Sequence, residues 1–377
     1  MHTTDVIVLG GGLVGSAIAY GLARLQTSVI QLDEGDIALR ASRGNFGLVW
    51  VQGKGLGYAQ YARWSLQSSK LWPQLQQSLL EETGVDVQLN QRGGYHICLT
   101  EEEVAVRRER LQWLQDQVGA DLYPFQILAP EDAREDLPGL GPAVAGVSYT
   151  PMDGHCNPLK LFHALHTANQ RRGVQYRPNT PAVAIQWRNG MFTVQAPNGE
   201  QFQAPKLVVA AGLANQSLSA EVGMHVPVRP NKGQVLITER LAPQLRCASN
   251  YVRQTDEGSI QIGDSMEEAG YDDTVRVPVS AEIAARAVAC FPALRNVRIV
   301  RSWAALRIMT PDGFPIYQES EECPGAYVAT CHSGVTLAAQ HALTVAPWIR
   351  DGVAPELLGA FPATRFNPET KITHYGR

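Results

Sequence analysis

The chain has 377 residues, enough for two domains or one large composite fold. Its net charge at pH 7 is −4, and it contains no cluster of basic residues of the kind that binds nucleic acid. Charged residues make up 18% of the chain, against a usual value of ~25%, which favours contacts with other subunits. No apolar run reaches the ~18 residues of a transmembrane helix.

The cysteines point to a reducing compartment. All six are scattered along the chain and none has the spacing of a zinc or iron–sulfur set, so we predict free thiols and no metal. An apolar strand already begins at Val6, which leaves no room for the charged and apolar regions of a signal peptide. We therefore expect a cytoplasmic protein.

The first element is a β-strand that runs directly into a glycine-rich turn. Residues 6–9 are followed by Gly10, Gly12 and Gly15 in the spacing Gly-x-Gly-x-x-Gly, and residues 16–23 continue as an apolar helix face. Gly10 permits the tight turn, Gly12 lets the backbone approach a pyrophosphate, and Gly15 lets helix and strand pack closely. This arrangement is typical of a dinucleotide site, in which the helix N-terminus faces the phosphates.

An acidic residue ends the next predicted strand. Asp33 follows residues 29–32 near the ~20-residue offset at which an acid accepts hydrogen bonds from a ribose. The predicted dinucleotide site therefore includes Asp33, Glu34 and the first helical residues Leu13 and Val14. The fingerprint alone does not separate NAD from FAD, and a plain β-turn-α unit is the alternative interpretation.

The next hundred residues contain loops, helices and short strands. A loop over 40–57 is rich in glycine and small residues, which is typical of backbone that lies close to a bound group. Periodicity predicts helices over 58–82 and 101–118, and alternation predicts strands between 85 and 99.

The second half of the chain adds a buried strand and an antiparallel sheet. Residues 206–212 contain no polar side chain between 207 and 211, as expected for a parallel strand covered on both faces. Residues 226–262 alternate as an antiparallel sheet does. Other predicted elements are helices over 159–172, 281–291 and 335–350, strands around 181–185 and over 326–330, and a hairpin at Asn198-Gly199.

Four stretches carry a resemblance to a known family. They are the glycine turn, Ala41-Ser42-Arg43-Gly44-Asn45-Phe46-Gly47, the run from Trp303 to Ile316, and residues 330–335. With these motifs in this order, the chain resembles the FAD-dependent amine and amino acid oxidoreductases of the D-amino acid oxidase type, which include glycine oxidase and sarcosine oxidase. The most specific motif, Arg-x-x-Thr-Pro-Asp-Gly at 307–313, favours FAD over NAD.

The loop over 47–55 looks closest to one branch of this family. That branch contains the catalytic β subunits of heteromeric dehydrogenases for opines, D-hydroxyproline or proline, and the related hydrogen cyanide synthase subunit. The resemblance implies an α/β fold in which a Rossmann-like FAD-binding domain is interleaved with an α+β substrate domain built on an antiparallel sheet. We assign the predicted FAD-binding domain to 1–85, 146–220 and 296–377, and the substrate domain to 86–145 and 221–295.

The resemblance implies that Arg307 holds the carboxylate of a substrate against the flavin. The planar guanidinium gives two parallel, charge-assisted hydrogen bonds and so orients the substrate Cα. A surface ion pair is the alternative for any arginine. Ile308 stands where many relatives have proline, which leaves the local backbone angle open.

Three further side chains are candidates for the substrate pocket by the same resemblance. Tyr251 matches a pocket-lining strand and would donate to the carboxylate, but a tyrosine packed in the sheet fits as well. Met266 would wall the pocket, and a core methionine is its alternative. His332 would contact the substrate or the flavin, or else be an ordinary loop histidine.

The remaining predicted cofactor contacts come from loops. Backbone N–H groups of Gly334, Val335 and Thr336 would stabilise negative charge on the flavin. Further predicted contacts are Ala41, Ser42, Asn45, Gly47 and Leu48 in the first loop, Val183 at the adenine, and Ala211 and Gly212 after the buried strand. Sarcosine oxidases attach their flavin to a cysteine at the position of Ala305, so we predict non-covalent FAD.

The predicted activity is oxidation of the C–N bond of an amino acid or opine by hydride transfer to flavin N5. One hypothesis is the catalytic β subunit of a multi-subunit dehydrogenase, with other subunits that carry a second flavin or an iron–sulfur cluster. A second is a free-standing glycine- or sarcosine-type oxidase that releases hydrogen peroxide. A third is a flavin-binding assembly or tRNA-modifying subunit without amine oxidation.

Overall fold

The computed structural model describes residues 1–35, 41–367 and 370. Residue 40 of the predicted glycine-rich loop and the tail after 370 lie outside this part of the chain. Among the described residues, no helix is long and apolar enough to cross a membrane.

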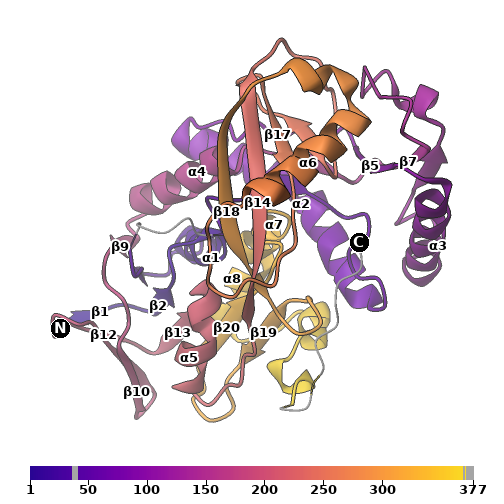
Figure 1. Ribbon diagram of the computed structural model, residues 1–377. Helices are drawn as coiled ribbons and strands as arrows, with labels where there is room; N and C mark the ends of the chain where they lie inside the picture. Colours follow the sequence, from indigo (N-terminus) through magenta and orange to yellow (C-terminus); the bar gives the residue numbers. More distant parts are fainter. Residues whose placement is uncertain (36–40, 368–369, 371–377) are drawn as a thin grey trace.

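A six-stranded sheet forms the centre of the nucleotide-binding half, in the order β19-β20-β13-β2-β3-β9 (Figure 1). Every neighbouring pair is parallel except β19 with β20. The strands are β2 (Val6–Leu9), β3 (Val29–Leu32), β9 (Gln175–Arg177), β13 (Lys206–Val209), β19 (Ile316–Glu319) and β20 (Ala326–Thr330). The carboxyl ends of the five parallel strands therefore meet at one edge, where ligands bind in sheets of this kind.

Both faces of this sheet are buried. Along β2, Val6 and Val8 face a core shared with helices α1 (Leu13–Arg24), α2 (Ala59–Thr83) and α8 (Ala346–Asp351). The alternating Ile7 and Leu9 face a second core, shared with a small sheet of order β1-β12-β11-β10. A strand covered on both faces must be apolar throughout, which explains the uninterrupted apolar runs in the sequence.

A second large sheet, in the order β16-β17-β14-β18, is antiparallel. It consists of β14 (Arg229–Arg240), β16 (Val252–Gln254), β17 (Ser259–Gly263) and β18 (Ile299–Met309). Helix α6 (Val277–Cys290) crosses one face of this sheet and buries Ile283, Ala287 and Cys290 there (Figure 1). The long pair β14–β18 sets the register that places the site: Asn231 lies opposite Arg307, and Gly233 opposite Ala305.

The other elements surround these two sheets. The helices are α3 (Glu101–Val118), α4 (Pro158–Arg171), α5 (Asn215–Ala220) and α7 (Ala338–Gln340), with a π-helical segment at His341–Val345. The strands are β1 (His2–Thr3), β4 (Leu48–Val49), β5 (Gly94–Cys98), β6 (Gln126–Leu128), β7 (Gly146–Thr150), β8 (Gly154–His155), β10 (Ala184–Arg188), β11 (Met191–Gln195), β12 (Gln201–Ala204) and β15 (Ala248–Ser249). Short 3₁₀ turns occupy 130–133, 212–214, 292–296, 356–360 and 363–365.

The structure confirms most predicted elements and corrects two. Between 85 and 99 only β5 forms, because left-handed backbone at Gln88 and Gly93 (φ +56° and +108°) interrupts the extended chain. The predicted helix over 335–350 is not continuous: turns precede α7, and the π-helical segment separates α7 from α8. The predicted fold class, a Rossmann-like nucleotide-binding domain combined with an antiparallel substrate sheet, is confirmed. The predicted domain boundaries stay a prediction; β18 pairs with β14, so residues 299–309 lie in the antiparallel sheet.

Candidate active site

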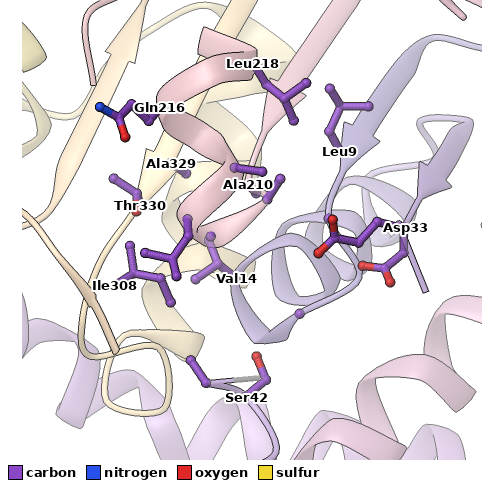
Figure 2. Close-up of a pocket in the computed structure, with 18 of the residues that line it drawn as sticks. Leu9, Val14, Asp33, Ser42, Ala210, Gln216, Leu218, Ile308, Ala329 and Thr330 are labelled. Carbon is purple, nitrogen blue, oxygen red and sulfur yellow. The ribbon is translucent and has the colours of Figure 1, made fainter. Parts of the chain in front are cut away.

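A cavity of about 680 Å³ lies at the carboxyl edge of the parallel sheet. Its walls come from the loops after β2, β3, β13 and β20 and from one face of β18. Figure 2 shows Asp33 on one side of this cavity and Ile308 and Thr330 on the other, with Val14 and Ser42 between them. We call it the nucleotide cavity; its volume lies within the ~300–1,000 Å³ typical of ligand sites.

The glycine turn has the geometry that its sequence predicts. Gly10 has a φ of +109°, and an added Cβ there would lie 2.3 Å from the carbonyl oxygen of Ala210. A Cβ on Gly15 would lie 2.1 Å from the carbonyl oxygen of Gly10, so only glycine lets α1 pack this closely on the turn. Ser42 Oγ accepts a hydrogen bond from the Leu13 N–H at 2.9 Å, which fixes the first loop beside the start of α1.

Asp33 lines the cavity and also organises its rim. Its Oδ2 accepts from the Gly11 N–H at 2.5 Å and its Oδ1 from the Gly35 N–H at 3.0 Å. Both hydrogen bonds hold the Asp33 carboxylate in a fixed position on the wall of the nucleotide cavity.

A smaller cavity of about 190 Å³, which we call the reaction cavity, adjoins the first one at Ala41. The strand β18 divides the two, because alternate side chains point to opposite faces of a strand. Leu306 and Ile308 line the nucleotide cavity, whereas Ala305 and Arg307 line the reaction cavity. The same strand thus contributes a wall to each of the two cavities.

Arg307 is held in place by three neighbours on two segments of the chain. Its Nη1 donates to Asn231 Oδ1 at 3.1 Å and to the Ser265 carbonyl at 3.0 Å, and its Nη2 forms an ion pair with Asp264. The carboxylate of Asp264, with 43% of its side chain exposed, thereby lies where a carboxylate ligand would meet the same guanidinium. Arg307, with 18% of its side chain exposed, is thus held in a fixed position, and it forms the ion pair that the alternative interpretation expects; its role as a carboxylate clamp stays a prediction.

The loop over 41–47 is tied to the antiparallel sheet through its carbonyl groups. The side chains of Trp303 and Gln261 donate to the carbonyls of Gly44 and Asn45 at 3.2 and 3.3 Å. Arg253 donates to the next carbonyl, that of Phe46. The substrate sheet thus positions a loop that lines both cavities.

Three polar side chains converge on Ser333 at the end of β20. Its Oγ accepts from Lys54 Nζ at 2.5 Å and from the Tyr61 hydroxyl at 3.0 Å, and lies 3.0 Å from His332 Nδ1. Since a hydroxyl accepts two hydrogen bonds and donates one, we assign the Ser333 proton to His332 Nδ1 and the ring proton to Nε2. Burial holds the pKa of His332 well below its ordinary value, with help from Lys54 and Arg307, so the ring is neutral at pH 7.

The turn after Ser333 presents free backbone donors. Within the part of the chain that the structure describes, the N–H groups of Gly334, Val335 and Thr336 donate to no protein acceptor. Val335 and Thr336 line the reaction cavity. Thr336 Oγ1 also accepts from the Trp50 N–H at 3.1 Å and so fixes the opposite wall. Such a group of donors favours a ligand atom with negative charge.

The predicted site residues divide into three groups. Gly10, Gly12, Leu13, Val14, Asp33, Glu34, Ala41, Ser42, Ala211 and Gly212 line the nucleotide cavity. Ala41, Asn45, Leu48, Arg307, His332, Val335 and Thr336 line the reaction cavity. Gly15, Gly47, Val183, Gly334, Tyr251 and Met266 are not among the described residues that line either one.

The residues of the third group have other neighbours. The Tyr251 ring packs under Arg286, whose guanidinium carbon lies 4.2 Å from the ring centroid, at the edge of the substrate-domain core. Met266 and Val183 are exposed, although Pro181 and Ala182 beside Val183 do line the nucleotide cavity. Their roles at the substrate or the cofactor stay predictions.

Sequence reasoning missed Lys54, Asp264 and Gly233, which all line the reaction cavity. Lys54 stands between Gly53 and Gly55, both with left-handed backbone, and this Gly-Lys-Gly run in a glycine-rich loop is the signal that was available. Asp264 and Gly233 carry no local signal, because only the pairing of β14, β17 and β18 brings them to Arg307.

These observations define the class of protein. The left-handed Gly10, the acid at the end of β3 and the elongated pair of cavities fit a dinucleotide, and the free N–H groups at 334–336 suit a group that becomes negatively charged. Gly10, Gly12, Asp33 and Ser42 would hold its nucleotide part, and Asn45, Val335 and Thr336 its reactive ring. The arrangement is that of a flavin-dependent oxidoreductase.

Comparison with known proteins places the chain within this class. Residues 5–348 match the family of FAD dependent oxidoreductases, and the chain belongs to this family. It is 44% identical over 374 residues to an opine oxidase subunit of Agrobacterium tumefaciens, a match that covers 99% of this chain and 100% of the relative. Hydrogen cyanide synthase subunit HcnC of Pseudomonas aeruginosa is 27% identical, with 98% and 97% covered. The crystal structure of glycine oxidase from Geobacillus kaustophilus superposes with a TM-score of 0.88 at 28% identity and covers 97% of this chain and 100% of that one.

The family and the cofactor predicted from the sequence are thereby confirmed. The chain is an FAD-dependent oxidoreductase, related along its whole length to enzymes that act on opines and on glycine.

Proposed function

We propose that this chain is the catalytic subunit of a multi-subunit dehydrogenase that oxidises the C–N bond of an amino acid with a secondary amine, such as an opine, D-hydroxyproline or proline. The single observation that carries the proposal is Arg307, fixed by Asn231 and Ser265 in a small cavity beside the nucleotide cavity. The 44% identity to a subunit of an opine oxidase supports both the substrate class and the assembly.

The residues of the chain supply orientation and charge. Arg307 would bind one substrate carboxylate and so place the Cα–H at a fixed position. A bound flavin supplies the hydride acceptor. The amine must be neutral to release the hydride. The imine from an opine takes up water to give a 2-oxo acid and a free amine, whereas the imine from proline or D-hydroxyproline stays cyclic.

The environment of His332 suits this chemistry. Its ring is neutral and its Nδ1 is occupied by Ser333, so the protonated Nε2 can only donate. The backbone N–H groups of Val335 and Thr336 are donors as well. His332, Val335 and Thr336 thus all present hydrogen-bond donors to a ligand that gains negative charge during the oxidation.

All six cysteines are free, which supports a reducing, cytoplasmic location. None belongs to a group of three or more potential metal ligands among the described residues. In this proposal an iron–sulfur cluster, like any second flavin, belongs to a partner subunit.

The test is anaerobic bleaching of the flavin by a panel of amines. Wild-type protein should be reduced by an N-(1-carboxyethyl) amino acid or by proline, and Arg307→Met should slow reduction by about 100-fold or more, since charge-assisted hydrogen bonds contribute ~1.5–3 kcal/mol each. If Arg307→Met is reduced at the wild-type rate, the carboxylate clamp is wrong. If no amine bleaches the wild-type flavin, the proposed function is wrong and a non-oxidising flavin-binding subunit is favoured.

A free-standing oxidase is the second candidate, favoured by the full-length similarity to glycine oxidase. The two candidates differ in the electron acceptor. Rapid release of hydrogen peroxide by the isolated chain would support the oxidase, whereas reoxidation only in the presence of co-purified subunits would support the dehydrogenase.

A further inference from the structure

We infer that the substrate carries two carboxylates, one on each carbon bound to the amine nitrogen, and that Lys54 binds the second while Arg307 binds the first. This inference rests on the proposed function and narrows it. It selects opine-type iminodicarboxylates over proline, D-hydroxyproline, sarcosine and glycine, which have a single carboxylate.

The charged side chains of the reaction cavity favour an anionic ligand. Its charged lining residues are Lys54, Arg307 and Asp264. Arg307 already has a carboxylate partner, whereas Lys54 forms no ion pair within the described part of the chain and makes one hydrogen bond there, to Ser333. An ammonium group removed from water without a counter-charge is costly, so this cavity favours an anion at Lys54.

Asp153 is a buried acid whose charge acts on Lys54. It does not line the reaction cavity, and its Oδ1 is occupied by the N–H groups of Val51 and Gln52 at 2.5 and 3.2 Å. Burial raises the pKa of Asp153 to about 7, so near neutral pH it is ionised only in part. Asp153 therefore holds the backbone that leads to Lys54 and does not neutralise the ammonium fully.

The backbone fixes the position of the Lys54 ammonium, and two of its three N–H donors are available to a ligand. Gly53 and Gly55 turn the chain on either side of it, and a Cβ on Gly55 would lie 2.3 Å from the Ala62 amide nitrogen at the start of α2. One of its three protons goes to Ser333 Oγ. Two donors remain, which is what a carboxylate needs.

The charges that face a bound ligand are those of Arg307 and Lys54. The Asp264 side chain is partly exposed, so it can turn towards water when a ligand carboxylate replaces it on Arg307. Two cations then face the ligand. A monocarboxylate matches one of them, and an iminodicarboxylate matches both with its nitrogen between them.

The experiment measures binding and not turnover. The probes are thiodiacetate, which has two carboxylates, and (methylthio)acetate, which has one; sulfur replaces nitrogen in both, so no C–N bond is oxidised. Dissociation constants for the FAD-loaded protein are obtained from the change in flavin absorbance at pH 7. Wild-type protein should prefer the diacid by roughly 10- to 100-fold, the factor expected for one charge-assisted hydrogen-bonded contact.

Lys54→Met should reduce this preference to less than about 3-fold and leave the affinity for the monoacid nearly unchanged. Lys54→Arg should keep most of the preference, and Lys160→Met, a change at a surface lysine paired with Asp256, should keep all of it. Flavin content and thermal unfolding of each variant show that it has folded.

Three results would overturn the inference. The first is equal affinity of the wild type for the two acids, and the second is an undiminished preference for the diacid in Lys54→Met. The third is an equal loss of affinity for both acids in that variant, which would place Lys54 at the flavin instead. The wild-type comparison decides even if a variant fails to fold. Because the probes bind without reaction, a negative result here is distinct from failure of amine substrates to bleach the flavin.

Discussion

The guanidinium of Arg307 lies across Gly233 on the neighbouring strand. An added Cβ at Gly233 would be 2.3 Å from Nη2 and 2.5 Å from the central carbon of the guanidinium, which is closer than any real contact. Gly233 faces Ala305, two residues before Arg307 on β18, so the side chain of Arg307 runs back along its own strand and over the glycine. The absence of a side chain at Gly233 therefore leaves the space that the guanidinium of Arg307 occupies, and it is part of the proposed carboxylate site.

Gly233→Ala should displace the guanidinium and weaken binding of carboxylate ligands by roughly 10- to 100-fold, the value of one hydrogen bond to a charged group. The measurement is the dissociation constant of (methylthio)acetate for the FAD-loaded variant. Gly359→Ala is the matched control, because a Cβ there meets nothing within 4 Å. An unchanged dissociation constant in Gly233→Ala would contradict the role of this glycine.

Gly15→Ala should lower flavin content and stability together. The new Cβ would lie 2.1 Å from the Gly10 carbonyl oxygen, so α1 must move away from the turn, at a cost of about 1–3 kcal/mol. The ratio of flavin to protein absorbance and the midpoint of thermal unfolding report the two effects. Normal flavin content in this variant would show that the close packing of α1 is not needed for binding.

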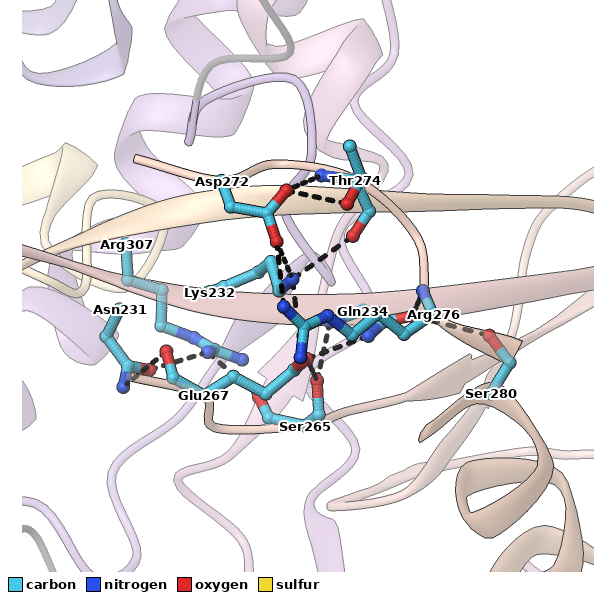
Figure 3. Close-up of polar contacts among 10 residues, drawn as sticks. All are labelled: Asn231, Lys232, Gln234, Ser265, Glu267, Asp272, Thr274, Arg276, Ser280 and Arg307. Carbon is cyan, nitrogen blue, oxygen red and sulfur yellow. Dashed lines mark hydrogen bonds and ion pairs between the residues drawn. The ribbon is translucent and has the colours of Figure 1, made fainter. Parts of the chain in front are cut away.

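Lys232→Met should destabilise the loop over 264–276. Lys232 is fully buried and pairs with Glu267 and Asp272 at 3.5 and 3.0 Å, and Gln234 donates hydrogen bonds to Ser265 and Glu267 of the same loop (Figure 3). Removing one partner of a fully buried pair costs ~3–5 kcal/mol; both carboxylates here keep some access to water, so we expect about 2 kcal/mol.

Urea unfolding measures this loss, with Lys160→Met as the surface control, for which under ~1 kcal/mol is expected. Because Tyr271 and Asp273 of the same loop line the nucleotide cavity, added FAD should recover part of the lost stability. Equal stability of Lys232→Met and wild type would show that the ion pairs only offset the cost of their burial.

The preference for thiodiacetate over (methylthio)acetate should fall as the pH rises through about 8. Burial lowers the pKa of Lys54 from 10.5 to about 8, with a further contribution from Arg307, so the ammonium is charged below this pH and neutral above it. Asp153 and Cys331 also act on Lys54, but the pKa of Asp153 is about 7 and burial raises the pKa of Cys331 to about 12, so neither group changes its charge much in the range where Lys54 loses its proton. A ratio that stays constant from pH 6.5 to 10 would rule out Lys54 as the source of the preference.

Much of the nucleotide half was predictable because its signals are local. The spacing of Gly10, Gly12 and Gly15, the apolar run of β2 and the acid Asp33 occur within about thirty residues, and each is a direct requirement of backbone geometry. The helix α3 begins and ends where the periodicity of residues 101–118 predicts. The break between α7 and α8 was not predictable, since apolar periodicity does not distinguish a π-helical segment from an α-helix.

The sequence by itself therefore determined the dinucleotide class of the cofactor and the order of the main elements, and through a resemblance it predicted a role for Arg307. Only the tertiary structure decided what surrounds that arginine. Gly233, Asp264 and Lys54 are 74, 43 and 253 residues away from it along the chain, and the β14–β18 register, the end of β17 and the loop beside α2 bring them to one cavity. The geometry of a turn or a strand depends on a few consecutive residues, so it can be predicted from sequence. The charge of a cavity depends on residues far apart in the sequence, which come together only after the sheets have formed.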